Sequence, residues 1–305
     1  MKAGTNLEKV LEAGQFAVTA EIGPPKGGSA RVIESKGEMI GHAADAFNVT
    51  DNQTAVVRMS SLAACALLKR MGLDTVMQML CRDRNRIMLQ SDICGAVALG
   101  IGNLLCLTGD HVKFGNHPSS KIVFDIDSIQ LISAVKSMRD EGKFISGEEV
   151  AGPIPIFIGA VENPYADPFE FRTARLAKKV KAGADFIQTQ AVYDVPKFAK
   201  WMAEVCDSGL DERVHVLAGI IPVKAVGMAR YMRDYVSGVE VPDWMIKRLE
   251  GAKDVREEGI KIILEIIEEA KLIPGVHGIH VQAVGWEDVV PEIVERAGLL
   301  PRPML

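Results

Sequence analysis

The residue of this sequence that most favours acid–base chemistry is Glu21, which lies near the end of the apolar run AVTAEI. A carboxyl group in such a place needs partners or has a raised pKa, and a raised pKa is what a general acid working near neutrality uses. We therefore expect Glu21 to be a general acid. The alternative is a glutamate paired with a neighbouring arginine for structure, because ion-pair networks also perturb carboxyl groups.

A second candidate is the turn Thr108-Gly109-Asp110, which follows another apolar run. Glycine permits a close approach of the backbone to a ligand, and the carboxylate of Asp110 can bind a ring N–H or a sugar hydroxyl. The three-residue pattern is short, so it gains meaning only together with its neighbours in the fold.

Basic residues form a third group, in a segment with helical spacing. They are Arg172, Arg175, Lys178, Lys179 and Lys181. Spacings of three and four place Arg172, Arg175 and Lys179 on one face of a helix. Such a face can bind phosphate, although most basic helical faces are merely solvated.

Metal and disulfide chemistry find little support in the sequence. The six histidines show no H-x-x-x-H or H-E-x-x-H spacing, and the five cysteines are an odd number without a C-x-x-C pair. We expect no catalytic metal, and we expect most of the cysteines to be small buried hydrophobic residues. The sequence also has no G-x-S-x-G elbow or kinase-type loop, and this absence argues against the commonest classes of hydrolase and phosphotransferase.

Short β-branched runs alternate along the chain with amphipathic segments, which is typical of parallel βα units. The expected strands are Phe16–Ile22, Ala46–Thr50, Thr75–Leu80, Asn103–Thr108, Ile154–Ala160, Phe186–Gln190, Val214–Ile220 and Gly278–Gln282. The expected helices include Ser60–Met71, Asn85–Leu99, Ser128–Glu141, Pro168–Ala182, Val195–Ser208 and Lys224–Tyr235.

Eight such units predict a (β/α)8 TIM barrel, an α/β fold, with the charged stretch Asp243–Lys271 adding extra helices before the last strand. A doubly wound sheet is the alternative, but its G-x-G-x-x-G turn is absent after the first strand, where the sequence reads GPPKGG. No linker or repeat divides the chain, so we expect residues 1–305 to form one domain.

Composition narrows the class of protein further. The 305 residues are 48% hydrophobic and 25% charged, with a net charge of −5, which argues against disorder and against nucleic-acid binding through a basic face. No run approaches eighteen apolar residues, and the first fifteen residues have a charged amphipathic pattern. We therefore expect a cytoplasmic protein with neither a membrane span nor a signal peptide.

In a barrel of this kind the chemistry gathers at the C-terminal ends of the strands. Polar side chains occur at most of these ends. They are Glu21, Thr50, Asp51, Gln78, Arg82, Thr108, Asp110, Glu162, Asn163, Gln188, Gln190 and Gln282. The residues alone thus predict a barrel enzyme with a polar mouth.

These segments together resemble the methylenetetrahydrofolate reductase family, flavin-containing barrels of one-carbon metabolism, nearly from end to end. FAVTAEIGPP is similar to the family's first-strand motif and FNVTDNQ to its second-strand segment, while LCLTGDHV resembles its arginine-glycine-aspartate turn. KKVKAGADFIQTQ is the most specific match, and LAGIIPV resembles the seventh strand with its proline, Pro222.

The resemblance implies that reduced flavin passes a hydride to 5,10-methylenetetrahydrofolate, giving 5-methyltetrahydrofolate. Glu21 would be the general acid, with Asp110 as a second catalytic residue. Substrate would be bound by Glu21, Asp110 and Gln190. The residues implied for flavin binding are Thr50, Asp51, Gln78, Thr108, Gly109, Asp110, Arg172, Arg175, Lys178, Lys179 and Gln188.

Several departures from the family pattern concern the flavin and its electron donor. Gln78 replaces the usual histidine, Thr108 replaces arginine, and the segment 162–167 lacks a histidine-proline pair, so FMN is possible in place of FAD. Met232 stands where a phenylalanine commonly stacks on nicotinamide, and Trp286 where an arginine is usual.

These losses resemble the branch of the family found in acetogenic bacteria. That likeness implies electrons supplied through a small zinc-containing partner subunit, in place of direct use of NAD(P)H, and an oligomeric assembly. Two other hypotheses remain at this point. One is a flavin-free, pterin-binding barrel methyltransferase, and the other is a folate-binding subunit that is not catalytic alone.

Overall fold

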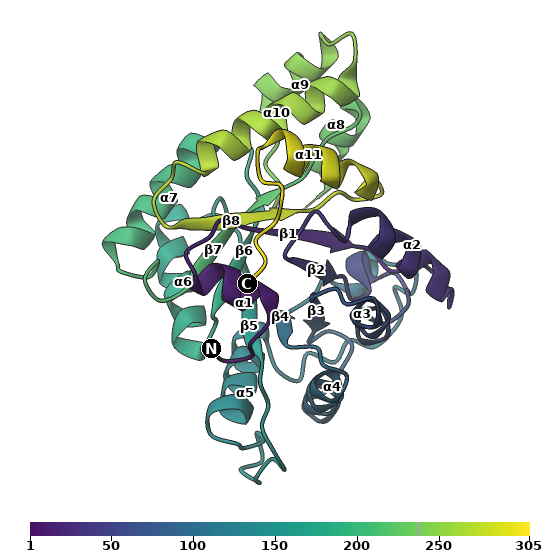
Figure 1. Cartoon of the computed structure of the whole chain (residues 1–305), viewed down its shortest axis with the longest axis vertical. Coiled ribbons are helices and arrows are strands. Elements are labelled where there is room, and N and C mark those ends of the chain that lie inside the picture. Colours follow the sequence, from purple (N-terminus) through teal and green to yellow (C-terminus); the bar gives the residue numbers. More distant parts are fainter. Residues whose placement is uncertain (237) are drawn as a thin grey trace.

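Eight parallel strands close into a barrel in the computed structural model, which describes residues 1–236 and 238–305 (Figure 1). The strands are β1 (Ala17–Ile22), β2 (Ala46–Val49), β3 (Thr75–Leu80), β4 (Asn103–Leu107), β5 (Phe157–Glu162), β6 (Phe186–Ala191), β7 (His215–Ile220) and β8 (Val276–Val281). They follow one another in chain order around the barrel, and β8 pairs with β1 in the register Ala17 to Gly278. The predicted (β/α)8 barrel is confirmed.

The expected strand bounds agree with the structure to within two residues, except at the start of β5. The sequence predicts a strand from Ile154, whereas β5 begins at Phe157. Pro153 and Pro155 explain the difference, because proline cannot donate a backbone N–H to a neighbouring strand.

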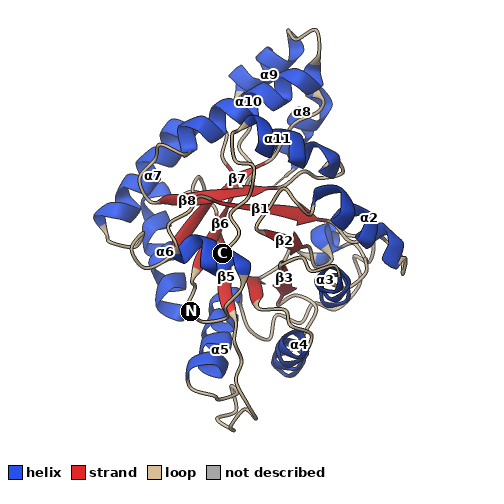
Figure 2. Ribbon diagram, viewed as in Figure 1, coloured by secondary structure: helices blue, strands red, loops and turns tan. Residues whose placement is uncertain are grey.

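Helices surround the barrel on the outside (Figure 2). They are α1 (Asn6–Glu12), α2 (Ala30–Ile40), α3 (Ser61–Arg70), α4 (Arg86–Ala98), α5 (Ser128–Asp140), α6 (Arg172–Ala182), α7 (Val195–Asp207), α8 (Val226–Tyr235), α9 (Asp243–Glu250), α10 (Val255–Ala270) and α11 (Val290–Arg296). Short 3₁₀ turns are η1 (Gln53–Ala55), η2 (Val112–Phe114), η3 (Phe169–Phe171) and η4 (Glu287–Val289). The extra helices expected before the last strand are α9 and α10, which lie beside α8 at one end of the molecule (Figure 1).

Side chains inside the barrel are arranged in layers. The lowest layer is apolar, and α1 covers it from the N-terminal side with Leu7, Val10 and Leu11. The rings of Phe157 and Phe186 stack there, with centroids 5.2 Å apart. A second and larger core fills the space between the strands and the outer helices. It includes the thiols of Cys65, Cys81 and Cys106, whereas Cys94 and Cys206 are half-buried.

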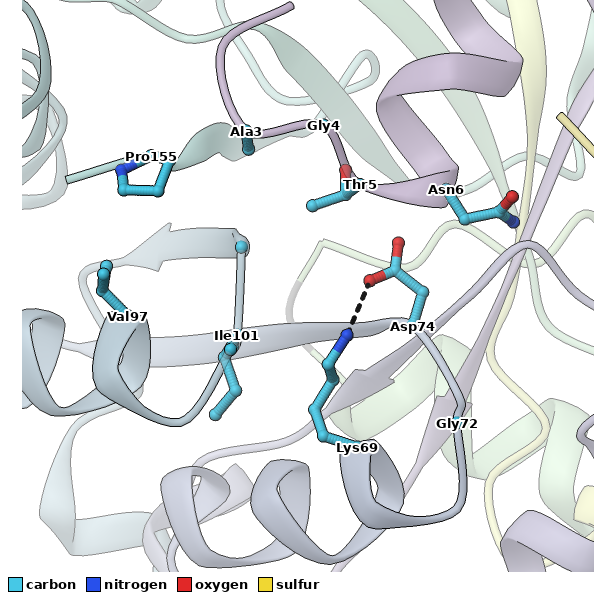
Figure 3. A pocket seen from close by; sticks show the side chains of 12 residues that line it. Ala3, Gly4, Thr5, Asn6, Lys69, Gly72, Asp74, Val97, Ile101 and Pro155 are labelled. Atoms are coloured by element: carbon cyan, nitrogen blue, oxygen red, sulfur yellow. Dashed lines mark ion pairs between the residues drawn. The ribbon is translucent and has the colours of Figure 1, made fainter. Parts of the chain in front are cut away.

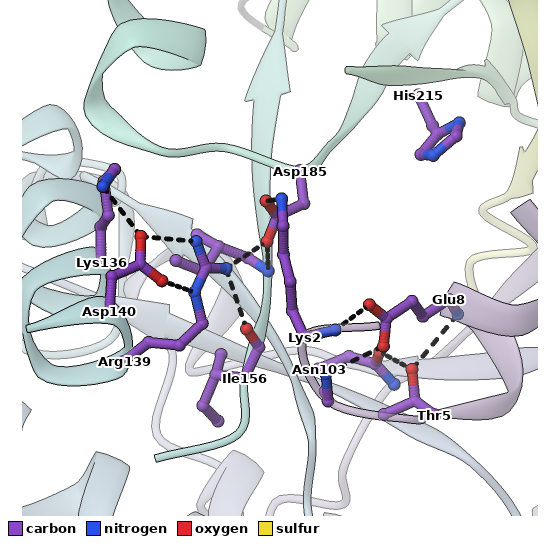
Figure 4. Close-up of polar contacts among 12 residues, drawn as sticks. Lys2, Thr5, Glu8, Asn103, Lys136, Arg139, Asp140, Ile156, Asp185 and His215 are labelled. Atoms are coloured by element: carbon purple, nitrogen blue, oxygen red, sulfur yellow. Dashed lines mark hydrogen bonds and ion pairs between the residues drawn. The ribbon is translucent and has the colours of Figure 1, made fainter. Parts of the chain in front are cut away.

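The N-terminal end of the barrel carries a network of ion pairs centred on the buried carboxylate of Asp185 (Figure 4). Asp185 accepts hydrogen bonds from Arg139 Nη1 at 2.6 Å and from the backbone N–H of Ile158 at 2.8 Å, and it is also bound by Lys2 Nζ. Nearby, Glu8 accepts from the backbone N–H groups of residues 2 to 4. These contacts fix the N-terminal segment beneath the barrel.

A cavity of about 330 Å³ lies at the same end, between the N-terminal segment and helices α3 and α4 (Figure 3). Its charged lining residues are Lys69 and Asp74, whose charged atoms are 3.8 Å apart. Asp74 also accepts hydrogen bonds from the backbone N–H of Leu7 at 3.1 Å and from the side chain of Asn103 at 3.2 Å. The carboxylate of this cavity is therefore already occupied by structural partners.

Candidate active site

The C-terminal mouth of the barrel contains a small polar cavity of about 130 Å³. Four of its lining side chains come from different strands or strand ends, namely Glu21, Gln78, Gln190 and Gln282. Because each of them occupies an inward position of the strand alternation, the barrel itself brings these four together. Leu105, Leu107 and Val161 provide apolar walls. With Gln188, which also lines the cavity, one ionisable carboxyl group thus faces four neutral amides.

The floor of this cavity is a hydrogen-bonded layer of four buried residues. Gln188 Nε2 donates to Thr19 Oγ1 and to Asn48 Oδ1, both at 3.0 Å, and Asn48 Nδ2 donates to Gln188 Oε1 at 2.6 Å. His280 Nδ1 lies 2.9 Å from Thr19 Oγ1, and burial lowers its pKa to about 3. Both the oxygen and the nitrogen of the Gln188 amide are therefore hydrogen-bonded within this layer.

Glu21 has an unusual proton affinity for a glutamate. Its pKa is raised to about 7, mainly because burial at the end of β1 disfavours the charged form, and also because the carboxylate of Glu287 is nearby. A hydrogen bond with Gln78 and the ammonium group of Lys36 act in the opposite direction. The result is a carboxyl group that can hold a proton near neutral pH and release it to a base at the mouth.

The loop after β2 uses its polar residues largely for internal contacts. Thr50 Oγ1 donates to Gln53 Oε1 at 3.1 Å. Asp51 is buried and accepts from Arg84 Nη1 at 2.6 Å and from the backbone N–H of Leu80 at 3.2 Å. The carboxylate of Asp51 therefore joins this loop to β3 and to the loop that follows it.

The turn after β4 is built around a glycine that no other residue could replace without strain. Gly109 has φ +98°, and a Cβ there would lie 3.1 Å from Arg82 Cβ. Arg82 is buried and donates to the backbone carbonyl of Asp110 at 3.1 Å and to that of Asn52 at 3.2 Å, so it ties the turn to the loop after β2. Thr108 Oγ1 donates to Ser128 Oγ at 3.1 Å.

Asp110 is exposed at this rim of the barrel. Within residues 1–236 and 238–305 its carboxylate accepts no hydrogen bond. It is therefore free to bind a ligand, unlike the carboxylate of Asp51.

The basic face of α6 divides into paired and unpaired groups. Lys179 is buried, and its ammonium group lies 2.7 Å from Glu162 Oε2 and also donates to the carbonyl of Val161. Burial lowers the pKa of Lys179, while Glu162 opposes that change. Lys179 is thus held at the end of β5, and its expected contact with a flavin phosphate stays a prediction.

The other basic residues implied for flavin binding on α6 are more accessible. Arg172 is half-buried, and its Nε atom is enclosed without a hydrogen-bond partner among the described residues. Arg175 and Lys178 are exposed. An anion near the start of α6 would therefore meet Arg172 and Arg175 without displacing an existing carboxylate.

Two residues singled out for electron supply lie away from the solvent. Met232 on α8 is 6% exposed and Trp286 after β8 is 4% exposed. The guanidinium group of Arg256 lies 4.9 Å from the centre of the Trp286 ring. Both side chains belong to the hydrophobic core, so neither presents a free face to a nicotinamide ring.

Sequence reasoning missed three residues that shape the site. His280 follows Gly278 by two positions on β8, and the strand alternation alone could have placed it in the floor beneath Gln282. Lys36 and Glu287 lie on α2 and η4, and the sequence has no signal that brings these two distant segments together.

The described part of the chain holds neither a candidate metal centre nor a candidate membrane-crossing helix. No group of three or more histidine, cysteine, aspartate or glutamate residues there is placed to hold a metal ion. No described helix combines the length and the apolar character needed to cross a membrane.

Comparison with known proteins gives one family. The family model for methylenetetrahydrofolate reductase matches residues 6–298. Methylenetetrahydrofolate reductase 1 of Schizosaccharomyces pombe is 29% identical over 233 residues, which are 74% of this chain and 36% of that protein. Methylenetetrahydrofolate reductase (NADH) 1 of Arabidopsis thaliana is 23% identical, over 98% of this chain and 51% of its own length. The chain therefore spans about a third to a half of these curated relatives.

Solved structures support the fold. A protein from Clostridium thermocellum, described as binding two copies of 5-methyl-5,6,7,8-tetrahydrofolic acid, superposes with a TM-score of 0.68 at 12% identity and covers 96% of this chain and 100% of its own. Oxaloacetate acetylhydrolase superposes with a TM-score of 0.54 at 11% identity, over 98% of this chain and 86% of its own. At such identities the likeness shows the barrel architecture alone.

Proposed function

The chain belongs to the methylenetetrahydrofolate reductase family, and we propose that it reduces 5,10-methylenetetrahydrofolate to 5-methyltetrahydrofolate at the C-terminal mouth of the barrel. The observation that carries this proposal is the position of Glu21, whose carboxyl group faces four amide side chains in the mouth cavity and whose pKa burial raises to about 7. The description of the Clostridium thermocellum protein as a binder of 5-methyltetrahydrofolic acid agrees with a folate-binding role for this architecture.

The residues of the mouth suit the proton chemistry of this reaction. The one-carbon bridge of the substrate must open to an exocyclic iminium ion before it can accept a hydride, and the departing ring nitrogen needs a proton. Glu21, protonated near neutral pH, is proposed to supply that proton. Asp110 and Gln190 are proposed to bind the donor and acceptor groups of the pterin ring. Gln190 lines the mouth cavity, whereas Asp110 lies outside its lining, on the exposed rim after β4, and has no internal partner among the described residues.

The residues present also suit a flavin, on three grounds. The exposed carboxylate of Asp110 accepts no hydrogen bond among the described residues, the enclosed Nε of Arg172 lacks a partner among them, and Arg175 adds a further positive charge. We propose that Arg172 and Arg175 hold the flavin phosphate, FAD or FMN, with Thr108, Gly109 and Asp110 beside the ring. A bound reduced flavin supplies the hydride, while the barrel supplies placement and charge.

The proposed function is tested by single turnover with flavin. Purified chain is incubated with FAD or FMN, reduced chemically, and mixed with 5,10-methylenetetrahydrofolate under anaerobic conditions. We expect the flavin absorbance to return as 5-methyltetrahydrofolate forms in equal amount. Flavin that binds and is never reoxidised by the folate would contradict the proposal.

A flavin-free, folate-binding barrel is the second candidate, and one observation favours it. Lys179, the residue implied to reach the flavin phosphates, is already paired with Glu162 at 2.7 Å. The two functions differ in a simple property, because a flavin-free protein would bind 5-methyltetrahydrofolate in calorimetry while taking up neither FAD nor FMN. We favour the reductase because Arg172 and Arg175 remain available.

We further propose that the isolated chain takes electrons poorly from NADH and receives them through a partner subunit. The support is that Met232 and Trp286 are both buried, so that neither side chain presents an exposed face on which a nicotinamide could stack. Stopped-flow mixing of the oxidised, flavin-loaded chain with NADH tests this. Bleaching of the flavin at about 1 s⁻¹ or faster would overturn it.

A further inference from the structure

An ion pair joins two distant segments beside the proposed acid. Lys36 on α2 and Glu287 on η4 are bound through Lys36 Nζ and Glu287 Oε1, and Lys36 Nζ also donates to the carbonyl of Gly23 at 3.0 Å. Gly23 follows Glu21 by two residues. The side chains of Lys36 and Glu287 are only 25% and 14% exposed, so the pair is partly shielded from solvent.

This pair supplies the charges that act on Glu21. The strands around Glu21 present neutral groups, which are Asn48 opposite it on β2, Gln78 on β3, Gln190 on β6, and His280 with Gln282 at β8. His280 is uncharged above a pH of about 3. Three charged groups lie at the segment that follows Glu21. Lys36 is on the carbonyl of Gly23 with its partner Glu287, and Arg58 donates to the carbonyl of Pro24 at 3.0 Å. Of these, Glu287 and Lys36 act on the proton equilibrium of Glu21.

We propose that Glu287 and Lys36 are positioning residues that set the proton affinity of Glu21 in opposite senses, Glu287 favouring the protonated carboxyl group and Lys36 the carboxylate. The pair is fixed relative to Glu21 because Lys36 is anchored on the carbonyl of Gly23. This inference rests on the proposed function, since it assigns control of the proton that Glu21 delivers.

The signs of the two effects follow from charge alone. A nearby anion disfavours a second anion, so Glu287 raises the pKa of Glu21, and a nearby cation does the reverse. Glu287→Gln removes the anion and leaves Lys36 unopposed, which lowers the pKa of Glu21. Lys36→Met removes the cation, keeps the apolar stem, and raises that pKa. A pair that served only to hold α2 against η4 would give no such reversal of sign.

Direct titration of Glu21 tests the proposal without substrate or flavin. The full chain is labelled with glutamate carrying ¹³C in the side-chain carboxyl group, and the Glu21 signal is assigned by its loss in Glu21→Gln. We expect the pKa of Glu21 to fall by about half to one unit in Glu287→Gln and to rise by a similar amount in Lys36→Met. In the double variant the two shifts should largely cancel.

Matched variants separate charge from structure. Arg31→Met alters an exposed ion pair of the same helix α2, with Glu38 at 3.0 Å, and should leave the pKa of Glu21 unchanged. Lys36→Arg and Glu287→Asp keep the charges and should also keep the pKa. If Lys36→Met does not fold, Glu287→Gln decides alone.

Shifts in the same direction for both variants, or no shift in Glu287→Gln, would overturn the proposal. The proposed function can fail independently, because the titration needs no turnover. If Glu21 titrates as expected and the chain still does not reduce 5,10-methylenetetrahydrofolate, the effect of Lys36 and Glu287 on Glu21 is supported and the proposed reductase function is wrong.

Discussion

The two ends of the barrel each place a carboxyl group among strand ends, and they treat it in opposite ways. At the N-terminal end, Asp185 receives hydrogen bonds from Arg139, Lys2 and the backbone of Ile158 (Figure 4). At the C-terminal mouth, Glu21 faces neutral amides and a nearby anion, Glu287. Both carboxyl groups lie largely out of solvent.

The difference teaches which buried polar groups serve stability and which serve chemistry. A buried carboxylate that is fully hydrogen-bonded and paired stays ionised and holds its surroundings together. A carboxyl group that lacks such partners keeps its proton to a higher pH, which destabilises the ionised fold but provides an acid. Barrel enzymes generally place chemistry at the C-terminal face and stabilising contacts at the N-terminal face, and the proposed acid Glu21 and the Asp185 network lie on the corresponding faces.

Cavity volume does not identify which end of the barrel holds the proposed active site. The cavity beside Asp74 at the N-terminal end is larger than the mouth cavity, at about 330 Å³ against about 130 Å³. Its carboxylate accepts hydrogen bonds from Leu7 and Asn103 and lies near Lys69, so it has structural partners (Figure 3). The state of the polar groups therefore identifies the site better than its volume does.

The largest effect is expected from removing the proton of Glu21. Glu21→Gln keeps the shape and the hydrogen-bonding capacity of the side chain but cannot donate a proton to the substrate nitrogen. Single-turnover reduction of 5,10-methylenetetrahydrofolate should fall by about 10²–10⁴. Binding of flavin, measured by fluorescence titration, should be little changed. A variant that forms 5-methyltetrahydrofolate at nearly the normal rate would show that Glu21 is not the acid.

The same chemical change at the other end of the barrel should act on stability. Asp185→Asn removes one of the two carboxylates that pair with the buried guanidinium group of Arg139, each at 2.6 Å, and leaves Asp140 as the other. Losing the charge-assisted hydrogen bonds of Asp185 should lower the free energy of unfolding in urea by about 1.5–3 kcal/mol. The rate per folded molecule should stay close to that of the unsubstituted chain. Equal stability of the two proteins would mean that this network contributes little.

The third expectation is that Glu21→Gln stabilises the fold at alkaline pH. The pKa of Glu21 is about 7 in the folded chain against an ordinary value of 4.5, so the folded state binds more protons between these pH values. Its contribution to stability is therefore complete below about pH 4.5 and is lost as the pH rises through about 7. Above pH 8, Glu21→Gln should be more stable by about 2–3 kcal/mol, and Asp185→Asn less stable. Urea unfolding at pH 5 and pH 8 measures both.

The pH dependence of turnover follows from the same group. A general acid must be protonated, so the folate reduction rate should decline as the pH rises through about 7. This limb should be absent from the residual activity of Glu21→Gln. A rate that increases through this range would require another group to be the acid.

Much of the fold and part of the mouth could be predicted from the sequence. The predicted strands place Glu21, Gln78 and Gln190 at or near their C-terminal ends, and a closed barrel brings such ends together at one mouth. Asp51 could not be assigned in this way, because its partner Arg84 lies in a different loop. The pairing of Lys179 with Glu162 was equally hidden, since spacing shows which residues share a helix face but not what that face meets.

The smallest effect concerns the basic residues of α6, which divide as the two carboxyl groups do. Lys179, like Asp185, is buried in an ion pair, whereas Arg172, like Glu21, forms no ion pair with an oppositely charged side chain among the described residues. Arg172→Ala should therefore weaken flavin binding by about 1.5 kcal/mol, roughly tenfold, without a loss of stability. Lys179→Met should instead lower stability first, because it leaves the carboxylate of Glu162 buried and unpaired. Lys181→Ala, which changes an exposed residue of the same helix, is the control for loss of a positive charge alone.

Flavin titration and urea unfolding of the three variants test this prediction. If Lys179→Met loses flavin affinity while its stability is unchanged, Lys179 must leave Glu162 to bind the phosphate. The distinction between paired and available basic groups would then be wrong for α6.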